Sequence, residues 1–373
     1  MAGHEIAGGG RTAHSDSNTT IGEPSGATKG ASGRAVLTRE AREEFEADLL
    51  AAGATRSSGA GRRAKVEAAD EWRTCFERDR DRILHSTAFR RLAGKTQVFI
   101  FPRDHQRTRL THALEVAQVA TSIATALRLN ATLAEAIALG HDCGHGPAGH
   151  ASEDALACFL PEGFDHAVWG ARVSLAGLNL CEETLDGISN HSWSRPAPST
   201  PEGEVVSWAD RIAYVCHDWE DACSAGIVTP SMLPDEVEKR CGTERSRQLG
   251  AFVHGLVDTS ASLGRIAMDE ELAEALAAFR RVDYESIYLR PASVAQGAAV
   301  VAVLRALVEH FADRPNAIPA AESGIAAGSE AALRNAVTYV AGMTDRFAMA
   351  TAVSELGWDP SKLPRGVDDW HRA

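Results

Sequence analysis

Four histidines fall within a stretch of 26 residues near the middle of the chain, together with acidic residues and three glycines. The stretch opens on His141-Asp142, continues through His145 and His150, and ends at His166. Mixed imidazole and carboxylate ligands hold divalent cations, and an ion with open coordination positions can activate water. Glycines at positions 144, 146 and 149 permit tight turns that can aim the histidines into one pocket. A solvent-exposed loop would explain one lone histidine, but the whole cluster predicts a metal site.

A second set of polar residues follows at helical spacing. Asp210, Tyr214, His217 and Asp218 occupy positions i, i+4, i+7 and i+8, so they share one face of a helix. Carboxylates and a phenol on one buried stripe need something to coordinate or to hydrogen-bond. A water-facing helix side is the alternative that this segment alone leaves open.

Positive charge is concentrated just before these candidate ligands. The chain carries 38 Lys and Arg against 51 Asp and Glu, a formal net charge of −13 that disfavours general coating of nucleic acid. Between residues 73 and 110, however, ten basic residues accompany four acidic ones, a local charge of +6. Arginine presents a planar fork to phosphate oxygens, so this segment fits an anionic small ligand. For Arg78 to Arg82 we favour ion pairs on a solvated helix face, and for Lys95 and Arg109 the ligand.

The elements that must position these groups are predicted to be helices. Apolar residues recur at spacings of three and four as far as Leu127, which predicts an amphipathic helix from Thr111 onward with His112 on its apolar stripe. Thr132 and Glu135 form a capping box ahead of a second helix, which is expected to run into the histidine stretch. Because period-two alternation of β-branched residues is rare, we predict an all-α fold.

Composition sets the N-terminal region apart. Residues 1–34 are rich in Gly, Ser, Thr and Ala and have too few large apolar side chains to form a core, so we predict a disordered tail. Thr38 is expected to cap a short helix through Leu50, and a second flexible stretch is expected over residues 53–63. We therefore predict a low-complexity tail with a short helix over 1–64, a metal-site core over 65–225, and a helical C-terminal part of the same catalytic unit over 226–373.

Cysteine usage and hydropathy indicate the compartment. The seven cysteines are widely spread and form no C-x-x-C pair, which is typical of a reducing environment. No stretch approaches the roughly 18 uninterrupted apolar residues of a membrane span, and the N-terminus lacks the apolar core of a signal peptide. We expect a cytoplasmic protein without a membrane partner.

The order of the candidate ligands resembles a known signature. His112, then His141-Asp142, then Asp210 resemble the H…HD…D pattern of HD-domain metal-dependent phosphohydrolases, which have a helical fold. Within that superfamily the chain is similar to the bacterial deoxyguanosinetriphosphate triphosphohydrolase (dGTPase) family. Five blocks carry the resemblance, at residues 85–99, 107–118, 141–150, 209–218 and 341–347.

The resemblance implies a reaction and a metal site. The expected reaction is hydrolysis of a deoxynucleoside triphosphate, dGTP or another dNTP, to the deoxynucleoside and tripolyphosphate, with water attacking the α-phosphorus. The metal ligands would be His112, His141, Asp142 and Asp210, holding Mn²⁺ or Mg²⁺ as the first expectation and Fe²⁺, Co²⁺ or Ni²⁺ as alternatives. Two imidazoles and two carboxylates leave coordination positions for an α-phosphate oxygen and for water.

The resemblance also implies the acid-base residues. The leaving 5′-oxygen of the sugar needs a proton donor, and His150 is the first choice, with Glu153 orienting it. His145 and His166 would contact the phosphates or the attacking water. His145 and His150 could exchange roles, because the sequence fixes no distances.

Substrate contacts follow from the same blocks. Arg109 is expected at the triphosphate, with Arg211 and Lys95 as weaker phosphate candidates. Around the deoxyribose the resemblance places Gln97, Tyr214 and Asp218, so that Tyr214 would fill the space of a 2′-hydroxyl. The remaining candidates are expected to be structural or receive no role: His217 as structural, Tyr288 as core packing rather than a base contact, and His191 without a role.

Two other classes of function stay open. One is an HD-domain phosphomonoesterase or phosphodiesterase acting on nucleotides, which the sugar-binding blocks around Gln97 and Tyr214 disfavour. The other is a catalytically decayed nucleotide-sensing or nucleic-acid-binding subunit, which the complete set of ligands and acid-base residues disfavours. The resemblance further implies a homo-oligomer and a dNTP that activates at subunit contacts, whereas nothing in the sequence indicates single-stranded nucleic acid.

Overall fold

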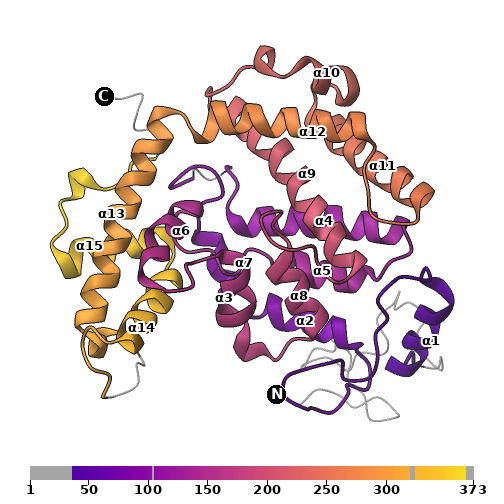
Figure 1. Cartoon of the computed structure of the whole chain (residues 1–373), viewed down its shortest axis with the longest axis horizontal. Helices are drawn as coiled ribbons and strands as arrows, with labels where there is room; N and C mark the ends of the chain where they lie inside the picture. Colours follow the sequence, from indigo (N-terminus) through magenta and orange to yellow (C-terminus); the bar gives the residue numbers. More distant parts are fainter. Residues whose placement is uncertain (1–35, 103–104, 320–323, 367–373) are drawn as a thin grey trace, which may run out of the picture. The chain divides into compact units, whose positions relative to one another are not determined.

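The computed structural model describes residues 36–102, 105–319 and 324–366, and these residues form α-helices joined by turns and short 3-10 or π segments (Figure 1). Within them no β-strand occurs, only two isolated bridges, which confirms the predicted all-α class. The chain divides into Met1–Thr38 and Arg39–Ala373, and the helices of the described residues belong to the second unit. The tail predicted over residues 1–34 lies outside the described residues.

The helices are α1 (Arg39–Leu49), α2 (Cys75–Leu84), α3 (Thr87–Arg91), α4 (Arg109–Ala126), α5 (Ala131–Gly140), α6 (His150–Leu156), α7 (His166–Trp169), α8 (Glu182–Asn190), α9 (Pro201–Ser224), α10 (Asp235–Cys241), α11 (Arg245–Leu263), α12 (Glu270–Asp283), α13 (Pro291–Asp313), α14 (Glu330–Ala341) and α15 (Asp345–Leu356).

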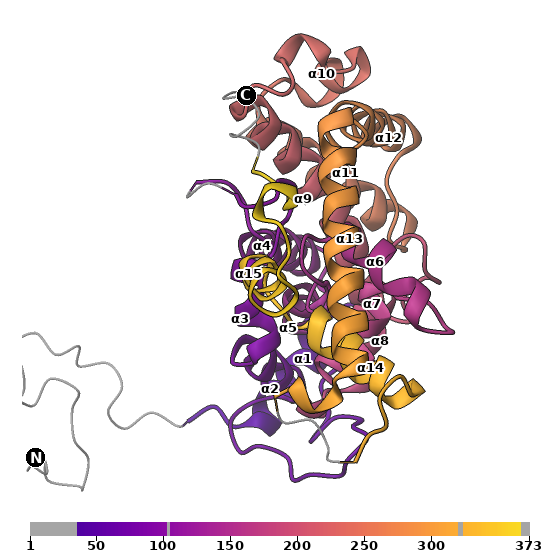
Figure 2. The same ribbon diagram turned by 90° about the vertical axis from the view of Figure 1, so that its left-hand side faces the viewer.

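Two clusters of buried apolar side chains stabilise this unit. The first lies among α2, α4, α5 and α9 and reaches α11 and α12, with Val116, Ile137 and Ile212 fully buried. The second lies among α6, α13, α14 and α15 and includes Leu304 and Val340. Figure 2 shows α13 running from α12 toward α14, so this helix connects the regions of the two clusters. Burial of apolar surface on this scale is the main force that stabilises the fold.

The amphipathic pattern located both helices of the metal site, but it placed their first residues imperfectly. α4 begins at Arg109 rather than Thr111, because Thr108 is its N-cap and forms a capping box with Thr111. α5 begins at Ala131, and its N-cap is Asn130, whose side chain accepts from the amide of Leu133. The predicted capping box at Thr132 is therefore wrong, since Asn130 is an equally strong cap two residues earlier.

Residues 53–63, predicted to be flexible, are tied to the helices by polar contacts. The Arg63 guanidinium is buried, pairs with Asp79 of α2 and donates to the carbonyl of Asn179. The amide and hydroxyl of Thr55 donate to Glu202 at 3.0 and 2.7 Å. Glycine and serine in this stretch suggested a linker, but long-range pairing with buried carboxylates orders it.

The arginines of α2 form ion pairs, but not the i,i+4 pairs along a solvated helix face that the alternating charges suggested. Arg78 and Arg82 both contact Glu67, at 3.2 and 2.8 Å, and Arg80 contacts Asp81 and Glu135. None of these three arginines lines the large cavity described below. Most of their partners lie outside the helix itself, so they fasten α2 to neighbouring segments.

One helix is apolar enough to be compared with a membrane span. α13 has 23 residues and a mean hydropathy of 1.6 over its most apolar window, of which 33% is buried. A core helix of a soluble protein passes the same test, so one such helix among the described residues says little about a membrane. Here the buried side of α13 packs in the second cluster and another part lines the cavity that holds the histidines.

Candidate active site

The four predicted metal ligands come together from three helices. His112 lies in the first turns of α4, His141 and Asp142 follow the end of α5, and Asp210 lies in the middle of α9. His112 Nε2 is 3.0 Å from Asp210 Oδ1, and His141 Nε2 is 3.6 Å from the same oxygen. Ligand atoms of His112, His141 and Asp142 all lie within 4.8 Å of one another. The HD pair and the two single ligands thus converge on one point.

These residues fit a divalent cation. The Nδ1 atom of His141 is 2.6 Å from the carbonyl oxygen of Ala138, which leaves Nε2 facing the carboxylates. That Nε2 is buried and has no hydrogen-bond partner. Histidines that bind metals characteristically donate their other ring nitrogen to such an acceptor. Burial would raise the pKa of Asp142, but the Arg109 charge holds it well below the ordinary value, so this carboxylate remains ionised.

Arg109 contacts Asp142, one of the predicted metal ligands. Its Nη1 atom is 2.6 Å from Asp142 Oδ2, and both side chains are buried. Arg109 also lines the cavity, and its Nη2 would be 2.7 Å from a Cβ placed on Gly149, which has a φ of +63°. A guanidinium that hydrogen-bonds to a ligating carboxylate and positions it is a common outer-sphere contact.

The turn between α5 and α6 is held from behind. A Cβ on Gly144 would lie 1.9 Å from the carbonyl oxygen of His166, so only glycine allows this close approach to α7. Asp345, at the start of α15, accepts from the amide of Ala148 at 2.7 Å. The same carboxylate accepts from the amide of Thr96 at 2.9 Å. The histidine turn is therefore braced by both the N-terminal and the C-terminal helices.

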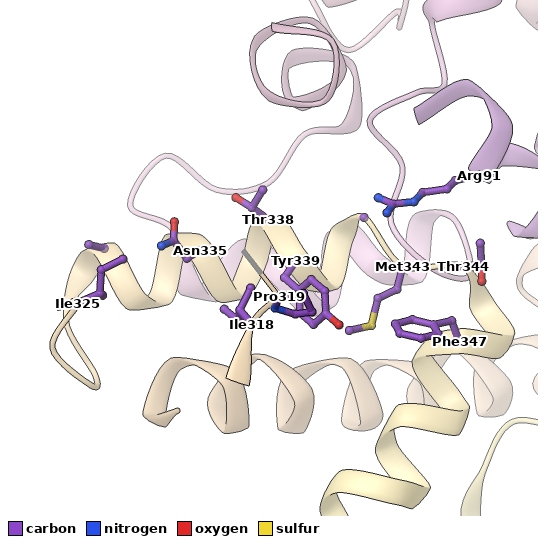
Figure 3. Close-up of a pocket in the computed structure, with 12 residues that line it drawn as sticks. Arg91, Ile318, Pro319, Ile325, Asn335, Thr338, Tyr339, Met343, Thr344 and Phe347 are labelled. Atoms are coloured by element: carbon purple, nitrogen blue, oxygen red, sulfur yellow. The ribbon is translucent and has the colours of Figure 1, made fainter. Parts of the chain in front are cut away.

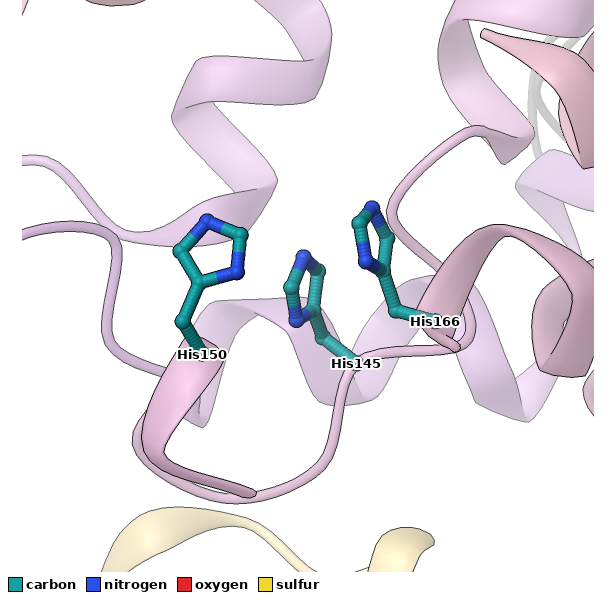
Figure 4. Close-up of side chains that lie close together, drawn as sticks. All are labelled: His145, His150 and His166. Carbon is teal, nitrogen blue, oxygen red and sulfur yellow. The ribbon is translucent and has the colours of Figure 1, made fainter. Parts of the chain in front are cut away.

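Three further histidines lie side by side next to the metal ligands (Figure 4). The rings of His145 and His166 stack at 3.7 Å with an interplanar angle of 15°. Glu153 accepts from Nδ1 of His150 and from Nδ1 of His166, at 2.8 Å each. The His145 Nε2 atom is 3.3 Å from Asp142 Oδ1, which joins this row to the metal ligands. Burial raises the pKa of Glu153, but its bonds to His150 and His166 outweigh this and lower it, keeping the carboxylate ionised.

One cavity of about 990 Å³ connects these groups with the predicted sugar site. Most of the predicted site residues line it: Gln97, Arg109, His112, Asp142, His145, His150, Glu153, His166, Asp210, Arg211, Tyr214 and Asp218. His141 lies just behind the wall, and its ring is packed edge-on against His112 and His191. The volume is large enough for a nucleotide-sized ligand.

The end of the cavity away from the histidines is formed by α9, α12 and the segment after α12. The Tyr288 hydroxyl donates to Asp218 Oδ2, so Tyr288 is part of the cavity wall rather than only core packing. Burial raises the pKa of Asp218 to about 7 although Tyr288 and His112 oppose the shift. Arg280 Nε donates to the Tyr214 hydroxyl at 3.0 Å. Oδ1 of Asp218 and Oε1 of Gln97 are buried acceptors without a partner.

Lys95 lies outside the cavity lining, contrary to its weak assignment as a phosphate contact. Its ammonium group donates to the carbonyl oxygens of His145 and Ala341. Burial lowers its pKa to about 8. The side chain thus fastens the histidine turn to the end of α14. His217 is also outside the lining and contacts Glu115 at 3.2 Å, in keeping with a structural role.

Sequence reasoning missed several residues of the cavity. His191, left without a role, is buried beside His166 and His141. Trp193 packs under the Arg211 guanidinium, 3.5 Å from its ring centroid, and donates to the carbonyl of Ser207. Arg280 and Arg305 add positive charge from α12 and α13. Only the histidine in Ser-Asn-His-Ser-Trp gave a signal that could have pointed here.

A second cavity, of about 750 Å³, lies between α3 and the α14–α15 region (Figure 3). Arg91, Tyr339, Met343 and Phe347 are among its lining residues. None of the predicted site residues lines it.

Comparison with known proteins agrees with the geometry. The sequence matches the HD domain family over residues 109–215 and the phosphohydrolase-associated domain over residues 266–353. It is 42% identical over 323 residues to a deoxyguanosinetriphosphate triphosphohydrolase-like protein of Caldanaerobacter subterraneus subsp. tengcongensis, covering 84% of this chain and 94% of the relative. A protein with the same description from Clostridium perfringens (strain SM101 / Type A) is 40% identical over 325 residues, covering 83% and 94%. One from Paracoccus denitrificans is 35% identical over 355 residues, covering 77% and 94%.

Proposed function

This chain belongs to the HD-domain deoxynucleoside triphosphate triphosphohydrolase family, and from that premise we propose that it hydrolyses a dNTP to the deoxynucleoside and tripolyphosphate. Water would attack the α-phosphorus, and the bond to the 5′-oxygen of the sugar would break. Membership supports a metal-dependent hydrolase. The choice of substrate and of products is our proposal.

One observation carries the proposal: a single cavity joins the metal ligands to two buried acceptors that have no partner. Gln97 Oε1 and Asp218 Oδ1 would be satisfied by a hydroxyl donor such as the 3′-hydroxyl of a sugar. A phosphate at the Asp142 end and a sugar at the Asp218 end are the two parts of one nucleotide. Enzymes that bind a hydroxyl in this way reject analogues that lack it.

Some residues of the proposed metal site would bind the ion, and another orients one of these ligands. His112, His141, Asp142 and Asp210 would hold the divalent ion, and Arg109 fixes the orientation of Asp142. When bound, the ion would polarise an α-phosphate oxygen and make a coordinated water more acidic. A set of imidazole and carboxylate donors suits Mn²⁺ and Fe²⁺ better than it suits ions that prefer oxygen ligands alone.

In the proposed reaction His150 donates a proton to the leaving 5′-oxygen. A 5′-alkoxide is a poor leaving group, so its departure needs a proton from a nearby acid. His150 is held by Glu153, which also accepts from the amide and ring of His166. The Glu153 carboxylate thereby fixes the orientation of both rings.

Four arginines supply charge for the polyphosphate. Arg109, Arg211, Arg280 and Arg305 line the cavity from α4, α9, α12 and α13. The Nε atoms of Arg109 and Arg211 are buried without a partner, and each guanidinium can donate hydrogen bonds to phosphate oxygens. Tyr214, held by Arg280, would occupy the space of a 2′-hydroxyl and favour deoxy sugars.

The test is a product assay with matched variants. The metal-loaded enzyme is incubated with each dNTP and each NTP plus Mn²⁺ or Mg²⁺, and the products are separated by chromatography. We expect deoxynucleoside and tripolyphosphate from at least one dNTP. Asp210→Ala should lose turnover together with the ion of this site, whereas Asp235→Ala, an exposed aspartate on α10, should behave as wild type. Release of pyrophosphate and a nucleoside monophosphate would contradict the proposal.

A further inference from the structure

The four arginines of the large cavity differ in how many of their hydrogen-bond donors are already used. Three of them donate to neighbouring groups: Arg109 to Asp142, Arg280 to Tyr214 and Arg305 to the carbonyl oxygen of Asp154. The fourth, Arg211, makes no hydrogen bond or ion pair within the described part of the chain, and its Nε is buried without a partner. A phosphate group that enters the cavity therefore meets one guanidinium whose N–H donors are all free.

An aromatic ring holds Arg211 in place of a carboxylate. Its guanidinium carbon lies 3.5 Å from the centroid of the Trp193 ring. At this distance the guanidinium must lie roughly flat on the ring, because an edge-on orientation would push a nitrogen into it. The N–H donors of a guanidinium point outward in its own plane, so a contact through its face uses none of them. The Trp193 ring thus fixes the guanidinium plane and leaves its edge for an anion.

The Trp193 ring is itself held by α9. Its Nε1 donates to the carbonyl oxygen of Ser207 at 3.1 Å, and Ser207 lies one helical turn before Arg211. Trp208, on the same helix, packs edge to face against it, with ring centroids 4.7 Å apart. Core packing does not account for this ring, because Trp193 is 47% exposed and lines the cavity. Ring and guanidinium are therefore fixed to one stretch of α9.

We propose that Trp193 is a positioning residue for the polyphosphate, which it serves by holding the Arg211 guanidinium flat with its donors free. Arg211 follows Asp210, a proposed metal ligand, so its charge lies beside the place where the ion would bind a phosphate. Restricting the arginine before the ligand arrives lowers the entropy lost on binding. The polyphosphate as ligand rests on the proposed function, whereas anion binding at Arg211 requires no turnover.

A double-mutant cycle on the binding of inorganic tripolyphosphate tests this role. The full-length Mn²⁺-loaded protein is titrated with tripolyphosphate at a fixed excess of Mn²⁺, and the dissociation constant is measured by calorimetry. Trp193→Ala should weaken binding about 3- to 30-fold, the range expected for the loss of a partly desolvated cation–π contact. In an Arg211→Ala background the same change should have little further effect, because Trp193 acts through the arginine.

Two further variants and a control separate positioning from packing. Trp193→Phe keeps an aromatic face and should bind tripolyphosphate nearly as tightly as wild type, whereas Trp193→Leu should behave like Trp193→Ala. Because both variants keep a large apolar side chain, a difference between them reports the aromatic face and not a loss of folding. Trp72→Ala removes a tryptophan that is 42% exposed and lies outside the cavity lining, and it should bind as wild type does.

Steady-state kinetics give a second readout. With the nucleotide that is hydrolysed, Trp193→Ala should raise KM by about the same factor as the dissociation constant and change kcat much less, because the contact acts on binding. Tripolyphosphate binding that is absent in wild type, unchanged in Trp193→Leu, or weakened equally by Trp193→Ala with and without Arg211 would overturn the proposal. A protein that shows the expected coupling but hydrolyses no dNTP would leave the role of Trp193 standing and contradict the proposed function instead.

Discussion

His145 and His150 lie five residues apart, yet their side chains have very different surroundings. The His145 side chain is 1% exposed and that of His150 is 75% exposed. Burial and the charge of Arg109 lower the pKa of His145 well below its ordinary value, so this ring stays neutral. His150 instead faces the cavity beside the ionised Glu153 carboxylate. We therefore propose His150, rather than His145, as the proton donor of the proposed reaction.

This assignment predicts the behaviour of one variant. His150→Ala should bind metal as wild type does but lose about 10²- to 10⁴-fold in kcat, the usual contribution of a positioned acid. Turnover of the preferred dNTP and bound metal per chain are the measurements. His310→Ala, a histidine of α13 that does not line the cavity, serves as the control and should keep full activity. Normal turnover of His150→Ala would remove this residue as the acid.

At the residue scale, sequence spacing predicted the groups that one helix or one turn brings together. His141 and Asp142 stood out as part of a dense local cluster, and Asp210 by its helical spacing to Tyr214 and Asp218. That they act as one ligand set with His112 was implied by the family resemblance. His191 could not be placed, since its approach to His166 depends on how the ends of α7 and α8 pack. Lys95 misled for the same reason: its charge suggested a phosphate, whereas tertiary packing gives it two backbone carbonyls.

At the element scale, the helices α4 and α5 were predictable from the sequence, whereas the ordered structure of residues 53–63 was not. The apolar stripe of α4 and α5 follows from side-chain spacing alone, which is a local property. Residues 53–63 have the composition of a linker, but they are ordered by contacts with α2, α8 and α9, which lie further along the chain. A composition-based prediction cannot include such contacts.

Arg63 offers a test of how strongly that segment is held. Arg63→Ala would leave Asp79 buried without its partner, and breaking a buried pair in this way costs about 3 to 5 kcal/mol in the free energy of unfolding. Arg62→Ala removes the neighbouring arginine, which is 69% exposed and pairs with Glu183 at the surface, so its effect on the free energy of unfolding should be much smaller. Urea denaturation of both variants measures the difference. Equal effects would show that the segment contributes little to stability.

At the scale of the whole molecule, the local excess of positive charge has a structural use. Of the basic residues that the structure describes between positions 73 and 110, Arg73, Arg78, Arg80, Arg82 and Arg107 form ion pairs with acidic side chains, and Arg109 is the one that lines the large cavity. The other arginines of the cavity wall come from α9, α12 and α13. The charge around the substrate is thus assembled by the fold from the whole chain, which is why one basic segment located it only in part.

The junction between the two hydrophobic clusters predicts a pH dependence of stability. Burial lowers the pKa of Lys95 from 10.5 to about 8. Between about pH 8 and 10.5 the unfolded chain therefore binds more protons than the folded one, so stability should rise with pH, by at most about 1.4 kcal/mol per pH unit. Below about pH 8 this contribution is constant. Lys95→Met should abolish the rise, and Lys65→Met, at an exposed position, should retain it when unfolding is followed in urea.

The Asp345 carboxylate has a consequence for how far the chain can be truncated. Helices α14 and α15 provide none of the proposed metal ligands, yet Asp345 holds the amides of Thr96 and Ala148 on either side of the catalytic turn. A truncated protein that ends after α13 would contain every proposed metal ligand. It would still lack the Asp345 carboxylate, which accepts from the amides of Thr96 and Ala148. We therefore expect the HD domain and the phosphohydrolase-associated domain to be needed together, and the smallest active fragment to include Asp345 at the start of α15.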